Sequence, residues 1–195
     1  MIVLTDGDHT AYRAAEVACR RLGIGLVRAS AGNPTPLRGQ ALVEAIRKTP
    51  GDPVLAMVDD RGDPARGRGE RALEDILRAP ELDVVGVVAV AAHTRGVAGV
   101  RPDASVTAEA ETVSGAVDKE GDPAGPVLHG DTVDVLARYP SVPVVGLGDP
   151  GKMDGEDRPE RGAPATTEAL RALLRGKFDE EGREVGHGGA VSRPG

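Results

Sequence analysis

Short runs of aliphatic residues alternate along this chain with stretches that repeat apolar positions at helical spacing. The run IVL at 2–4 predicts a strand, and the stretch over 9–22 predicts the helix that follows it. The same order continues, with further strands expected at 24–29, 54–58, 84–92 and 142–148, and helices at 42–48, 69–79, 131–139 and 165–176. Strands and helices in this order favour a parallel sheet joined by right-handed crossovers.

We therefore predict one α/β domain over residues 1–177. Its core is a doubly wound, mostly parallel sheet of about five strands with helices on both faces. Residues 95–130 break the alternation with short valine-containing pieces between Gly, Asp and Pro, which indicates an irregular insertion with a small β-hairpin. Residues 178–195 are rich in glycine and charge and have no periodicity, so we expect a disordered tail.

Composition narrows the class of function. The formal net charge of -7 argues against a nucleic-acid binder, which normally carries a basic surface. Cys19 is the only cysteine in the sequence, so no internal disulfide can form, and a reducing compartment is expected. No basic leader precedes the first strand, and the longest apolar run, 84–92, is too short to cross a bilayer. We expect a soluble cytoplasmic protein without a transmembrane segment.

Charged residues follow four of the predicted strands. Because the carboxyl ends of parallel strands meet at one edge, where α/β proteins bind ligands, these side chains are expected to gather there. Carboxylates that gather in this way suit Mg²⁺ or Ca²⁺. The candidate ligand or metal-binding residues are Asp6, Asp8, Asp59, Asp60, Asp63 and Asp149, and the candidates to face an anion are Lys152, Arg61 and His93.

The same aspartates have a simpler interpretation, since Asp at a strand end often caps the next helix or forms an Asx turn. Asp131 is expected to cap the helix over 131–139 in this way. Three glycines after the third strand, Gly62, Gly67 and Gly69, predict a flexible loop over the site. The spacing of Gly67 and Gly69 fits a dinucleotide-binding fingerprint, but that motif follows directly on a first strand, whereas these glycines lie well beyond the third. No catalytic triad is evident, so catalytic residues stay unknown.

Several separated segments resemble one known family, the stage V sporulation protein AE family. The matching segments, in order, are VLTDGD, SAGNPT, MVDDRG with GRGE, VVGVVAVA, HGDTV, and GLGDPGKM followed by RGAPAT. The resemblance implies a role in sporulation or spore germination. It implies a forespore protein, peripheral at the spore inner membrane, that docks as an accessory subunit on the membrane proteins of the dipicolinic acid channel. The family lends no catalytic residues to this chain.

A weaker likeness is to toprim-type domains, which hold Mg²⁺ between an acidic residue after the first strand and an Asp-x-Asp after a later one. Asp6 and Asp8 could stand in the first position and Asp59-Asp60 in the second, although the usual Glu is absent and Asp-Asp-Arg departs from the motif. A Mg²⁺-dependent phosphoryl-transfer or nucleotide-binding enzyme is therefore the alternative, and ligand binding without chemistry is a third. The oligomeric state stays open.

Overall fold

The structure, a computed structural model, describes residues 1–61, 67–93 and 96–176. Its centre is a sheet in which five parallel strands lie in the order β2 (Gly25–Leu26), β3 (Val54–Met57), β1 (Ile2–Leu4), β4 (Gly86–Val90) and β7 (Val144–Leu147). These five strands confirm the predicted parallel sheet. The expected tail, 178–195, lies outside the described residues.

The predicted hairpin is present, and it extends the main sheet. Strand β5 (Ala104–Val106) pairs in parallel with β7 and antiparallel with β6 (Thr112–Val113), so the sheet has seven strands in all. The alternation of strands and helices in the sequence did not predict β5 as a sixth parallel strand, because no helix lies between β4 and β5. The interruption over 95–130 is thus irregular in sequence but continuous with the sheet in space.

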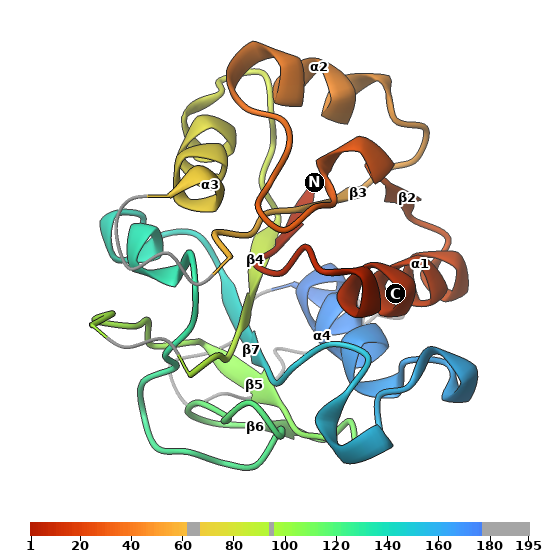
Figure 1. Cartoon of the computed structure of the whole chain (residues 1–195), viewed down its shortest axis with the longest axis vertical. Helices are drawn as coiled ribbons and strands as arrows, with labels where there is room; N and C mark the ends of the chain where they lie inside the picture. Colours follow the sequence, from red (N-terminus) through yellow and green to blue (C-terminus); the bar gives the residue numbers. More distant parts are fainter. Residues whose placement is uncertain (62–66, 94–95, 177–195) are drawn as a thin grey trace, which may run out of the picture.

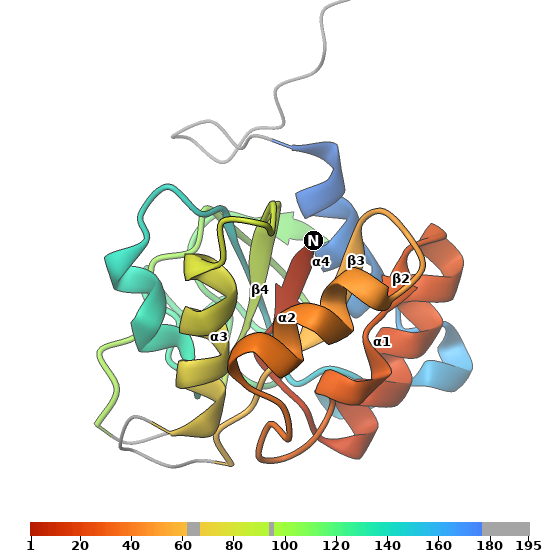
Figure 2. The same ribbon diagram turned by 90° about the horizontal axis from the view of Figure 1, so that it is seen from above.

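Helices cover both faces, as Figures 1 and 2 show. Helices α1 (His9–Leu22) and α4 (Pro164–Arg175) pack on one face, while α2 (Gly39–Lys48), α3 (Arg68–Arg78) and the 3-10 helix η2 (Val133–Arg138) pack on the other. Shorter 3-10 turns are η1 (Arg28–Ser30), η3 (Met153–Gly155) and η4 (Pro159–Arg161). No helix among the described residues combines the length and apolar character that a membrane span requires.

Each central strand is buried on both sides, which explains its continuous aliphatic sequence. In β1, Ile2 and Leu4 pack with α1 and α4, whereas Val3 between them packs with α2 and α3. Aromatic residues make up only 2% of the chain, so the buried residues of both cores are Ala, Val, Leu, Ile and Met, joined on the α1 face by Cys19.

Two predicted elements differ from the structure. The strand expected at 24–29 ends after Leu26, because Ser30 closes a 3-10 turn by donating to the Val27 carbonyl and accepting from Met57 N. The helix expected at 131–139 is the shorter η2, and Asp131 is not its cap. Thr132 precedes η2 with a left-handed φ of 69° and makes no capping bond to it.

Gly69 lies buried in the first turn of α3, where the helix crosses the end of β3. A Cβ atom at this position would lie 2.6 Å from the carbonyl carbon of Asp59 and 2.8 Å from its N and O atoms. Backbone cannot yield as a flexible side chain can, so only glycine permits this approach.

We predict that Gly69→Ala lowers the free energy of unfolding by about 1–3 kcal/mol, the usual cost of overpacking. Helix propensity alone predicts the opposite sign, a gain of about 1 kcal/mol. Urea unfolding decides between them. The matched control is Gly23→Ala, where φ is 71° but the space is open, and about 1 kcal/mol of backbone strain is expected. A Gly69→Ala variant more stable than the wild type would contradict the close packing.

Candidate functional site

A pocket of about 190 Å³ lies at the carboxyl ends of the central strands. Its floor is the end of β4 and the backbone that follows it, and its walls come from five separate loops. The polar residues that line it are Thr5, Asp6, Asp8, Asn33, Asp59, Lys119, Asp131, Asp149 and Lys152. The pocket therefore lies at the edge where parallel α/β sheets place ligands.

Three carboxylates converge in this pocket. Asp6 and Asp8 come from the turn after β1, and Asp149 follows β7; one oxygen from each lies within 4.8 Å of the other two. Asp8 also caps α1, because its Oδ1 accepts bonds of 2.8 Å from both Thr10 N and Ala11 N. Its Oδ2 remains directed toward Lys152.

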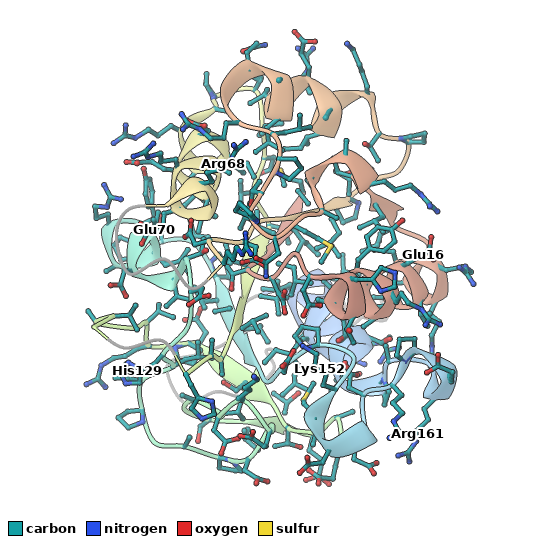
Figure 3. The ribbon with its side chains drawn as sticks, viewed as in Figure 1. Glu16, Arg68, Glu70, His129, Lys152 and Arg161 are labelled. Carbon is teal, nitrogen blue, oxygen red and sulfur yellow. The ribbon has the colours of Figure 1, made fainter. Side chains whose placement is uncertain are left out.

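Lys152 offsets the negative charge of this cluster. Its Nζ lies 2.9 Å from Asp8 Oδ2 and 3.1 Å from Asp149 Oδ1, and Figure 3 shows the side chain between α1 and the loop after β7. Burial alone would lower the pKa of Lys152, but its bonds to the two carboxylates raise it. Lys119, from the insertion, approaches Asp149 Oδ2 at 3.5 Å. Two ammonium groups thus face three carboxylates.

Asp6 is the carboxylate of the cluster that carries no lysine partner among the described residues. Its pKa is raised to about 7, mainly by burial and in part by the nearby charges of Asp8, Asp59 and Asp149, while one bond from Asp8 N acts to lower it. Burial also tends to raise the pKa of Asp8. The bonds from Ala11 N and Lys152 outweigh this effect and hold the pKa of Asp8 below its usual range. The two carboxylates therefore differ in protonation near neutral pH.

The loop that carries Asp149 and Lys152 is fixed from behind by Asp157. This fully buried carboxylate accepts bonds from Gly151 N (2.8 Å), Thr166 N (3.0 Å) and Thr166 Oγ1 (2.5 Å), which join the loop to the start of α4. On its other side the loop is held by a 2.8 Å bond from Asp149 N to the Lys119 carbonyl. Asp149 is thus positioned by two elements distant in sequence.

The two aspartates that end β3 have different partners. Asp59 lines the pocket, but its oxygens accept from Gly7 N at 3.1 Å and Arg61 N at 2.7 Å, and it stays outside the three-carboxylate cluster. Asp60 faces the other way and accepts from Gly69 N, Glu70 N and Thr132 Oγ1 at 2.6–3.0 Å. Burial raises the pKa of both carboxyls against these bonds. Asp60 therefore caps α3 and ties it to η2.

The remaining candidates lie away from the pocket or outside the described residues. Arg61 and His93 are exposed and do not line it. Gly67 precedes α3 and, like Gly69, packs closely against the aspartates that end β3. Gly62 and Asp63 lie outside the described residues, and the flexible loop stays a prediction.

Sequence patterns did not indicate three residues of the pocket, Asn33, Lys119 and Asp131. Lys119 belongs to the insertion, where no motif marked it. Asp131 was visible in the segment HGDTV but was interpreted only as a helix cap. The signal that could have drawn attention to it is the glycine before it, because Gly130 leaves room for the carbonyl of Val90 at the end of β4.

The donor set of the pocket suits a hard cation. Mg²⁺ and Ca²⁺ take oxygen ligands, and Asp6, Asp8 and Asp149 offer three carboxylates to one position. Lys119 and Lys152 could at the same time pair with an anionic group carried by that cation.

Comparison with protein-family models matches residues 1–176 to the family described as stage V sporulation protein AE1. Comparisons with curated proteins and with solved structures find no match.

We predict that Asp6 makes folding stability fall as pH rises from about 4 to about 7. In this window the folded state binds the Asp6 proton and the unfolded state, with a pKa of 3.8, has released it. Asp6→Asn removes this dependence on pH. The free energy of unfolding of the variant, relative to that of the wild type, should therefore increase by about 1–2 kcal/mol from pH 5 to pH 8, a figure that allows for partial exposure of Asp6.

Urea unfolding at several pH values measures this difference. Asp122→Asn, at an exposed position of the insertion, controls for the loss of one negative charge. Unfolding free energies of wild type and Asp6→Asn that run parallel from pH 5 to pH 8 would contradict the raised pKa of Asp6.

Proposed function

Because the chain belongs to the stage V sporulation protein AE family, which implies a role in sporulation, we propose that it is an accessory subunit of the spore dipicolinic acid channel system. In this role it acts in sporulation or spore germination by docking, from the forespore cytoplasm, on channel proteins of the spore inner membrane. The observation that carries the proposal is the extent of the family match, which includes every described strand and helix.

Co-expression with the channel membrane proteins tests the docking role. After detergent extraction, a tag on the full chain should retain those membrane proteins, and an unrelated membrane protein of similar size should wash through. If none of the channel proteins is retained and the chain stays in the supernatant of sedimented membranes, the docking role is wrong.

A second candidate function is favoured by the carboxylate cluster. The oxygens of Asp6, Asp8 and Asp149 are close enough together to hold one Mg²⁺, and Lys152 and Lys119 face the same pocket. A bound Mg²⁺ would stabilise negative charge on a phosphate group, and the two lysines would orient it. This supports binding of a phosphorylated or nucleotide ligand, with or without phosphoryl transfer. The third carboxylate of this cluster is Asp149, whereas the toprim-like interpretation of the sequence expected Asp59 beside Asp6 and Asp8.

Thermal unfolding tests this candidate with Mg²⁺, Ca²⁺, magnesium nucleotide and calcium dipicolinate as separate additions. A ligand at 100 times its Kd stabilises the fold by about 2.7 kcal/mol, which should raise Tm by roughly 5–10 °C for a domain of this size. The shift should disappear in Asp149→Asn and persist in the exposed control Asp122→Asn. No shift with any addition, or an equal shift in both variants, would remove the cation site.

A further inference from the structure

Lys119 enters the acidic pocket from the insertion, and its backbone is held firmly in place. Its carbonyl accepts a 2.8 Å bond from Asp149 N, and the turn that carries it is closed by Asp118, whose carboxylate accepts from two N–H groups of the turn at 2.9 and 3.0 Å. Gly148 lets this turn lie against the end of β7, because a Cβ atom there would lie 2.8 Å from the Lys119 carbonyl oxygen. The place of Lys119 beside the pocket is therefore fixed by backbone contacts.

The side chain of Lys119 is held much less firmly than its backbone. It is 41% exposed, and within the described residues its Nζ makes one ion pair, the 3.5 Å contact with Asp149 Oδ2, and no hydrogen bond. Lys152, by contrast, donates to Asp8 Oδ2 at 2.9 Å and to Asp149 Oδ2 at 3.2 Å. Of the two ammonium groups in the pocket, that of Lys119 is therefore the one that a ligand can take from its present partner most easily.

A buried hydroxyl group faces the same pocket. Thr5 is only 3% exposed and belongs to the pocket lining. Its Oγ1 accepts a 2.9 Å bond from Val90 N, and its hydroxyl proton has no acceptor among the described residues. Because buried donors are normally paired, this hydroxyl is available to an oxygen atom of a ligand.

The charges of the pocket decide what such a ligand can carry. Five carboxylates line the pocket against two lysines, so an anion alone would be repelled. A divalent cation held by Asp6, Asp8 and Asp149 reverses the local balance, because these three carboxylates would then face four positive charges, two of the cation and two of the lysines. An anionic group can therefore enter with a cation but not without one.

The available space limits how much of a ligand is anionic. The pocket measures about 190 Å³, which is below the usual 300–1,000 Å³ or so of ligand pockets, so it holds one end of a ligand. An adjoining hollow of about 190 Å³ shares Lys119, Asp149 and Lys152 with it, and there Glu120 and Asp154 also contribute carboxylates. A single phosphate group on an otherwise uncharged ligand fits this pair of hollows better than a phosphate chain.

We propose that Lys119 determines the specificity of the pocket by binding the phosphate group of a phosphomonoester, which enters together with a divalent cation. The inference rests on the second candidate function and names its ligand class. When the cation takes an oxygen of Asp149, this carboxylate attracts Lys119 less, and the ammonium group pairs with the phosphate instead. Thr5 donates its hydroxyl proton to another phosphate oxygen. Cation and phosphate therefore strengthen each other's binding by the same factor.

Amide NMR titrations of the ¹⁵N-labelled full chain test this coupling with Mg²⁺, with inorganic phosphate and with both. Free concentrations are corrected for the association of Mg²⁺ with phosphate in solution. We expect phosphate to bind at least tenfold more tightly at saturating Mg²⁺ than without it, and Mg²⁺ to gain the same factor at saturating phosphate. Glycerol phosphate and phosphatidic acid vesicles, each with Mg²⁺, distinguish a soluble phosphomonoester from a lipid headgroup, and coupled binding of either supports the ligand class.

Lys119→Gln should change the two affinities in opposite directions. Phosphate in the presence of Mg²⁺ should bind about tenfold more weakly, because a hydrogen bond to a charged group is lost. Mg²⁺ alone should bind severalfold more tightly, because one positive charge no longer competes for Asp149. Lys119→Arg should retain the coupling. The matched control is Lys48→Gln, an exposed lysine of α2 that pairs with Glu44 at 3.1 Å, and it should change neither affinity.

Three results would overturn the inference: equal phosphate binding with and without Mg²⁺, coupling that survives in Lys119→Gln, or a Lys119→Gln variant that loses affinity for Mg²⁺ as well as for phosphate. The last of these would show that Lys119 only supports the local structure. If Mg²⁺ still binds the wild type but not Asp149→Asn, the cation site of the second candidate function stands without this role of Lys119. If Mg²⁺ does not bind the wild type at all, both are wrong.

Discussion

The parallel pairing of β1 with β3 and β4, and of β4 with β7, is the constraint on which the candidate site depends. It sends all four carboxyl ends to one edge, so the aspartates that follow these strands meet whether or not they attract one another. Lys152 reduces the repulsion between these carboxylates because it forms ion pairs with both Asp8 and Asp149. Asp6, which has no such partner among the described residues, has a pKa of about 7 as a consequence of burial.

Much of this could be predicted from sequence, because aliphatic runs with intervening helical periodicity leave few topologies open. Five parallel strands and the gathering of Asp6, Asp8 and Asp149 follow from that pattern alone. The rest depends on tertiary contacts. Lys119 reaches the pocket only because β5 joins the edge of the sheet. Asp60 turns from the pocket because Gly69 N, Glu70 N and Thr132 Oγ1 donate hydrogen bonds to its carboxylate on the other side. No local spacing encodes either contact.

The short helix η2 runs between the acidic pocket and a second hollow of about 350 Å³. Asp131, two residues before it, lines the acidic pocket, and Tyr139, directly after it, lines the second hollow. Asp60 fixes its start through Thr132, and Glu74 fixes its end through Arg138. A cation in the pocket would therefore lie beside one end of an element that is held against α3 at both ends.

The most direct measurement is a ¹³C NMR titration of the side-chain carboxyl of Asp6, with and without Mg²⁺. If the carboxyl edge is one site, Asp6 should titrate near pH 7 in the absence of cation, and Mg²⁺ should shift its titration to lower pH because cation and proton compete for the same oxygens. An Asp6 that titrates near pH 4 and does not respond to Mg²⁺ would contradict the account, and would leave these aspartates as caps and turn residues of the fold.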